Sequence, residues 1–178
     1  DMIMPVKELL SQALALHSED RLKEAAIHYG KVLEVEPDHL QACFNLAIIC
    51  HGGGDLPGAI VNYRKVLGLE PENVQVLYYL ANALRDQGNR DDAAALYQQF
   101  LVLDHTFTGA HYNLGILHYH QEEYEQAMGC YREALTIDPS HAGSMYNLGI
   151  IHFEQNDYEQ AAVSYEKALV ICPEDVDT

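Results

Sequence analysis

The sequence predicts an all-α fold, an α-solenoid of five stacked helix-turn-helix repeats. Prolines at positions 37 and 71, and again at 139 and 173, lie 34 residues apart, and His105 stands where the intervening proline is expected. Apolar residues recur at helical spacing within each period, and the helix formers Ala, Leu, Glu and Gln are plentiful. A period of 34 divides the chain into repeats one to five, which are 6–39, 40–73, 74–107, 108–141 and 142–175.

The first helix of each repeat is predicted from an apolar stripe at repeat positions 4, 7, 8 and 11. Position 7 is Leu in the last four repeats, and position 8 is always small. A small residue lets the backbone of a neighbouring helix approach closely. The residues at position 8 are Ala13, Ala47, Ala81, Gly115 and Gly149.

The second helix is predicted from a stripe at positions 20, 24, 27 and 28. Position 20 is always Ala, position 24 always Tyr and position 28 always Leu. Polar or Gly-rich turns such as Gly53-Gly54-Asp55 separate the two helices, and proline at position 32 cannot continue the second one. The Tyr column consists of Tyr29, Tyr63, Tyr97, Tyr131 and Tyr165.

These columns resemble the tetratricopeptide repeat (TPR) family, whose marks include Leu-Gly/Ala at positions 7–8, Ala at 20, an aromatic residue at 24 and Pro at 32. The resemblance covers residues 6–175 and implies a right-handed superhelix forming a single TPR domain over 1–178. Repeat three departs from the pattern, because Phe100 is bulky for position 27 and His105 replaces the proline. We expect altered packing there without a break. Without a capping helix after repeat five, we expect the chain to be a fragment of a longer protein.

In TPR proteins the first helices line a concave surface that binds extended peptides, and the resemblance implies the same use for positions 5, 6, 9 and 12 here. Position 5 forms an aromatic row, and position 6 is Asn in repeats two, four and five. The candidate peptide-binding residues are Phe44, Asn45, Tyr78, Tyr79, Asn82, Arg85, Tyr112, Asn113, Tyr119, Tyr146, Asn147 and Phe153.

Residues of these types suit the recognition of a peptide. Tyrosine offers a large contact area with a hydrogen-bonding hydroxyl, and the Asn amide both donates and accepts, so it can pair with a peptide backbone. The Asn row resembles that of the TPR superhelix of O-linked N-acetylglucosamine transferase, although Tyr79 interrupts it. The alternative is that these Asn residues bond the neighbouring helix. A carboxylate clamp for chaperone tails is disfavoured, because the basic residues it requires are missing.

Charge and motifs exclude several function classes. The formal net charge of −17 disfavours nucleic acid and anionic membranes as partners. It would attract a basic partner, and the alternative is that the charge only keeps a helical protein soluble. Four cysteines without CxxC spacing predict reduced thiols in the cytoplasm. Neither His118 nor His152 belongs to an obvious tetrahedral metal set. No nucleophile–base constellation or nucleotide-binding motif is present, so we expect neither cofactor nor catalysis.

The sequence therefore predicts a protein- or peptide-binding scaffold that grips an extended segment in its concave groove. One alternative remains open in another class, the substrate-recruiting arm of a larger enzyme, such as a glycosyltransferase, whose catalytic domain lies elsewhere. A further alternative is self-association through uncapped ends of the stack.

Overall fold

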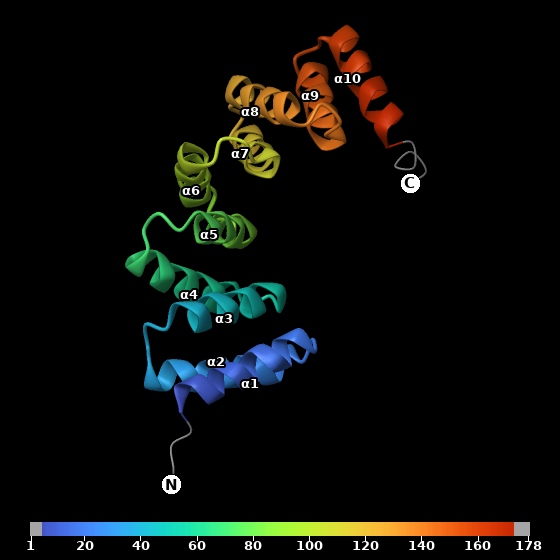
Figure 1. Ribbon diagram of the computed structural model, residues 1–178. Helices are drawn as coiled ribbons and strands as arrows, with labels where there is room; N and C mark the ends of the chain where they lie inside the picture. The colour runs from blue at the N-terminus through green and yellow to red at the C-terminus, as the bar shows by residue number, and fades with distance from the viewer. Residues whose placement is uncertain (1–4, 173–178) are drawn as a thin grey trace. The chain divides into compact units, whose positions relative to one another are not determined.

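The computed structural model describes residues 5–172, and every regular element in that range is an α-helix (Figure 1). Each predicted repeat contains one pair of helices. The ten helices are α1 (Val6–Ser18), α2 (Leu22–Val35), α3 (Leu40–Gly52), α4 (Leu56–Leu69), α5 (Val74–Gln87), α6 (Arg90–Leu103), α7 (Thr108–His120), α8 (Tyr124–Ile137), α9 (Ala142–Glu154) and α10 (Tyr158–Ile171). The predicted all-α fold of five helical hairpins is confirmed.

The helices group into two compact units that divide between Leu96 and Tyr97, within α6. In the first unit, α1 packs on α2 and α3 on α4, and the pairs meet through α2–α3 and α4–α5. In the second unit, α7 packs on α8, α9 packs on α10, and α8 contacts α9 (Figure 1). Within the units, α3, α5 and α9 thus each contact the second helix of the preceding pair, as a repeat stack requires.

The turn inside every hairpin depends on a left-handed residue at repeat position 15. The backbone φ at this position lies between 60° and 90° in all five repeats. Glycine adopts this conformation without strain, whereas a residue with a Cβ pays a steric cost that is smallest for Asn and Asp. The five residues are Asp20, Gly54, Gly88, Glu122 and Asn156. The common geometry explains why all five hairpins close in the same number of residues.

Several helices begin at a residue whose side chain accepts a backbone N–H from the first turn. Asp55 caps α4 through Gly58, with 3.0 Å between oxygen and nitrogen, and Asn73 caps α5 in the same way. His39 and His141 use their ring nitrogens Nδ1 to cap α3 and α9. Such caps satisfy backbone donors that have no partner within the helix.

The core of each of the first four hairpins is built around the tyrosine at position 24. Tyr29, Tyr63, Tyr97 and Tyr131 have no exposed surface. A Cβ added at Gly115 would lie only 2.6 Å from Cε1 of Tyr131, so glycine is what admits the ring there. The small residues of positions 8 and 20 therefore serve the close approach that the sequence predicts.

The junction after α6 shows the altered packing that the sequence predicts for repeat three. Both α4 and α6 span 14 residues, so replacing proline by His105 does not change the helix length. Phe100 is 4% exposed, and its ring meets that of Phe107 edge-on at 5.7 Å. Phe107 occupies the position of the capping residues His39 and His141, but makes no side-chain cap for α7. An aromatic contact replaces a polar cap at this junction.

We predict that replacing Glu122 by Gly stabilises the chain, because Glu122 holds a φ of 60° that glycine adopts freely. The gain should be about 0.5–1 kcal/mol after the larger unfolded-state entropy of glycine is subtracted, and urea unfolding measures it. The matched control is Gly88→Ala at the same repeat position, where φ is 90° and nothing lies within 4 Å of an added Cβ. This control should lose stability. Equal effects at the two sites would contradict the role assigned to position 15.

Candidate functional site

Two asparagines of position 6 contact the buried tyrosine of position 24 in the preceding repeat. Nδ2 of Asn45 donates to the hydroxyl of Tyr29 at 3.1 Å, and Nδ2 of Asn147 donates to the hydroxyl of Tyr131 at 3.3 Å. Asn113, in the same column, is 8% exposed. The neighbouring-helix role left open by the sequence is therefore present in the structure. Each bond uses one N–H of the amide, and the amide oxygen is a further acceptor.

Repeat three breaks this pattern, because Tyr79 occupies the position of the asparagine. The buried hydroxyl of Tyr63 has no hydrogen-bond partner among the described residues. The rings of Tyr63 and Tyr79 stack instead, with centroids 6.0 Å apart and planes 15° from parallel. Phe44 meets Tyr79 edge-on at 5.7 Å, and Tyr78 does so at 6.1 Å. Burial raises the pKa of Tyr63 well above its usual range, so its hydroxyl remains protonated.

The predicted residues of the first unit therefore form an aromatic cluster with a polar border. Phe44, Tyr78 and Tyr79 are half-buried, and the first two both contact Tyr79. The predicted site residues Asn82 and Arg85 follow on α5. Arg85 donates to Oδ1 of Asp86 through Nε at 2.9 Å and through Nη2 at 2.8 Å.

Asp86 also links two repeats, because its Oδ2 lies 3.0 Å from Nε2 of His51 on α3. Burial alone would raise the pKa of Asp86, but the hydrogen bonds from His51 and Arg85 outweigh it and lower that pKa. The border of the aromatic cluster therefore carries an ionised carboxylate.

In the second unit the predicted aromatic residues lie along α7 and α9. Tyr146 and Phe153 are the exposed ones, at 54% and 57%. Tyr112 is half-buried, and its ring meets that of His141 at 4.8 Å. Tyr119 donates its hydroxyl to Oε1 of Glu154 at 2.7 Å, and this carboxylate raises the pKa of Tyr119 to about 12. Of the two exposed rings, Phe153 is next in sequence to Glu154, which accepts this hydrogen bond from the preceding repeat.

The sequence analysis missed two carboxylates that border these residues. Asp86 and Glu154 occupy repeat position 13, and each accepts a hydrogen bond across a separation of 35 residues, from His51 or from Tyr119. Position 12 of one repeat thus pairs with position 13 of the next. The sequence would have revealed this pairing if position 12 of each repeat had been compared with position 13 of the next, because a hydrogen-bonding residue at the first is matched by a carboxylate at the second in both cases.

Two searches of the described residues bear on other functions. No group of three or more His, Cys, Asp or Glu side chains within residues 5–172 is arranged to hold a metal ion. None of the helices in that range is both long and apolar enough to span a bilayer.

Comparison with protein families agrees with the helical hairpins. The family described as "Cilia and flagella-associated protein 70 middle TPR-like domain" matches residues 77–178, more than half of the chain. The chain belongs to this family. A second model, described as "Tetratricopeptide repeat", matches residues 51–102. The predicted resemblance to TPR proteins is thereby confirmed. None of the curated proteins compared with the chain matches it.

Solved TPR structures share the fold of this TPR-like chain. MamA from Desulfovibrio magneticus RS-1 superimposes with a TM-score of 0.88 at 18% identity, covering 97% of both chains. YrrB, titled "a TPR protein with an unusual peptide-binding site", superimposes with a TM-score of 0.84 at 23% identity, covering 93% of this chain and 86% of YrrB. Identities this low establish a common fold alone.

We predict opposite effects of removing a hydroxyl from two equally buried tyrosines. Tyr131→Phe removes the acceptor of the Asn147 hydrogen bond and should lower the free energy of unfolding by about 0.5–1.5 kcal/mol. Tyr63→Phe removes a hydroxyl without a partner and should leave stability unchanged or raise it by about 1 kcal/mol. Urea unfolding of both variants measures the difference. A comparable loss in Tyr63→Phe would show that its hydroxyl is satisfied in solution.

Proposed function

We propose that this chain is a non-catalytic TPR scaffold that binds an extended segment of a partner protein on the concave side of its first helices. The single observation that carries the proposal is the exposure of two aromatic rings on the first helix α9, 54% for Tyr146 and 57% for Phe153. Exposed aromatic residues gathered in one place usually mark an interaction surface. The family match supports a binding role and gives no support to the recruiting arm of an enzyme.

The aromatic residues supply contact area, and the asparagines supply polar recognition. Rigid Tyr and Phe rings lose little conformational entropy on binding, so they are effective anchors. The amide oxygens of Asn45 and Asn147 are the acceptors with which we expect these residues to meet backbone N–H groups of the ligand. YrrB is titled as having a peptide-binding site, and a similar use of this fold fits the proposal.

A basic ligand segment suits the electrostatics of the chain. The net charge is −17, and the ionised Asp86 borders the aromatic cluster of α3 and α5. Glu154 follows Phe153 in sequence and occupies repeat position 13, as Asp86 does. Such a field speeds the association of a cationic partner and weakens with added salt.

Peptides that bind the wild-type chain can be selected from a displayed random library. We predict that Phe153→Ala weakens their binding about tenfold, which corresponds to a loss of roughly 1.4 kcal/mol of binding free energy. Fluorescence anisotropy at two salt concentrations measures the affinity and its electrostatic share. Because Phe153 is 57% exposed, the variant should keep its helical circular dichroism.

The matched control is Val170→Ala, which truncates an apolar side chain of α10 that is 83% exposed. It should leave the affinity of the selected peptides unchanged. Unaltered binding to Phe153→Ala, or equal losses in both variants, would place the binding surface elsewhere.

The family description also bears on location, because it contains the words cilia and flagella. We propose that the scaffold acts in a cilium or flagellum, which refines the cytoplasmic location that the sequence predicts. The protein carrying a fluorescent tag should concentrate in the cilium of a ciliated cell. A uniform signal in the cell body, with none in the cilium, would contradict this proposal.

A further inference from the structure

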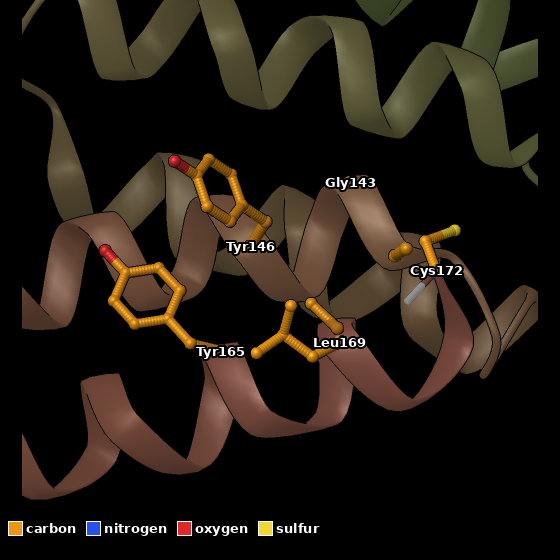
Figure 2. A pocket seen from close by; sticks show the side chains of 7 residues that line it. Gly143, Tyr146, Tyr165, Leu169 and Cys172 are labelled. Carbon is orange, nitrogen blue, oxygen red and sulfur yellow. The ribbon is translucent and has the colours of Figure 1, made fainter. Parts of the chain in front are cut away.

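A small cavity of about 270 Å³ lies in the second unit, among residues of α8, α9, α10 and the turn that follows α8. Four of its lining residues are apolar, and the two polar ones both come from α10. The six residues are Leu135, Pro139, Met145, Leu148, Ser164 and Lys167. The cavity shares no lining residue with the larger one that Tyr146 and Tyr165 line (Figure 2). It is therefore separate from the concave surface proposed above.

A hydroxyl group and an ammonium group border this apolar cavity together. Ser164 and Lys167 stand three residues apart on α10, a spacing that places both side chains on one face of the helix. Lys167 is exposed, and it is the only charged residue that lines the cavity. The ion pairs formed within residues 5–172 do not include Lys167. A carboxylate held at the edge of the cavity can accept hydrogen bonds from both groups.

Repeat five alone combines a small hydroxyl residue at repeat position 23 with a lysine at position 26. In repeat two, where position 26 is also lysine, the longer Asn62 stands at position 23 and its Nδ2 donates to the carbonyl of Gly58 at 2.9 Å. Position 23 is His28, Asn62, Leu96, Cys130 and Ser164, and position 26 is Lys31, Lys65, Gln99, Glu133 and Lys167. The chemistry of this cavity is thus particular to repeat five and is not a feature that recurs every 34 residues.

The polar edge of the cavity occupies positions that stay accessible when another repeat follows. Lys65 and Glu133 stand at the position of Lys167, and both are exposed although α5 packs on α4 and α9 packs on α8. Cys130 stands at the position of Ser164 and is likewise partly exposed. Positions 23 and 26 therefore face away from the surface that a following repeat covers.

The volume suits a single anchoring side chain. Sites for drug-sized molecules usually measure about 300–1,000 Å³, and this cavity is smaller. Leu135 and Leu148 offer apolar contact to a Leu, Met or Phe side chain, and the flexible thioether of Met145 adapts to its shape. An apolar anchor with polar contacts at its edge is the usual form of an energetic hot spot in a protein interface.

We propose that this cavity binds an extended segment of a partner protein in which Asp or Glu stands two residues after a large apolar residue. Residues two apart in an extended chain point to the same side. The apolar side chain fills the cavity, while the carboxylate accepts from Oγ of Ser164 and Nζ of Lys167. Because the net charge of −17 opposes acidic ligands at long range, the contact with Lys167 determines this preference. The concave site, by contrast, favours a basic segment.

The test titrates the peptide Gly-Ser-Leu-Ser-Glu-Ser-Gly, blocked at both ends, into the intact chain while NMR follows the methionine methyl groups. The methyl resonance of Met145, assigned through Met145→Leu, should shift because Met145 lines the cavity. The resonance of Met128, which is 4% exposed in the core of repeat four, should stay in place. A second peptide with Lys instead of Glu should bind about tenfold more weakly, through loss of a charge-assisted hydrogen bond.

Two variants introduce residues that other repeats carry at the same positions, so both should keep the fold. Lys167→Glu, the residue of repeat four, should reverse the preference, with the Lys peptide binding more tightly than the Glu peptide. Ser164→Asn, the residue of repeat two, lengthens a side chain at the edge of the cavity and should weaken the Glu peptide about threefold or more.

Several outcomes would overturn the proposal. An unmoved Met145 methyl resonance at millimolar peptide would do so, and so would equal affinities of the wild-type chain for the Glu and Lys peptides. Phe153→Ala should bind the Glu peptide with unchanged affinity, and a loss in that variant would assign the peptide to the concave surface. Because the two sites share no residue, failure of this cavity leaves the concave proposal to its own test.

Discussion

Burying a tyrosine in each of the first four hairpins sets the conditions that the rest of the repeat must meet. The rings of Tyr29 and Tyr131 have no exposed surface, so each needs a small residue on the first helix of its own hairpin and a partner for its hydroxyl. Glycine at 115 meets the first condition for Tyr131, and Asn147 of the following repeat meets the second. The hydroxyl thus couples neighbouring repeats, because the asparagine comes from the following repeat.

Repeat three meets the same demand in a different way. Tyr79 cannot supply an amide to Tyr63, so hydrogen bonding gives way to ring stacking and to the contact with Phe44. The cost is a buried hydroxyl without a partner, a penalty of about 1–3 kcal/mol. The same stacking brings aromatic residues of α3 and α5 into contact with one another.

The period and the columns of the sequence predicted the helices well, because each column reports a packing condition that recurs every 34 residues. The columns did not predict the turn geometry, because Asp20, Gly54 and Glu122 share a left-handed backbone but have different types of side chain. The sequence left open that the asparagines bond the neighbouring helix, but it did not identify the tyrosine partner, because Asn147 and Tyr131 belong to different columns, 16 residues apart. To find contacts between different columns of adjacent repeats, one needs either a structure or a comparison of one column with another, offset by one repeat.

The double use of asparagine has a consequence for locating any ligand. Replacing Asn147 by Ala removes the partner of a buried tyrosine together with an amide that we propose to bind the ligand, so lost affinity and lost stability would be inseparable. Phe153 carries no such ambiguity, because its ring contacts Tyr158 on its own hairpin and is more than half exposed. In a repeat stack the residues that recur most regularly are those that hold neighbours together. The exposed residues that vary along the row, Phe153 among them, are therefore the sharper indicators of what the surface recognises.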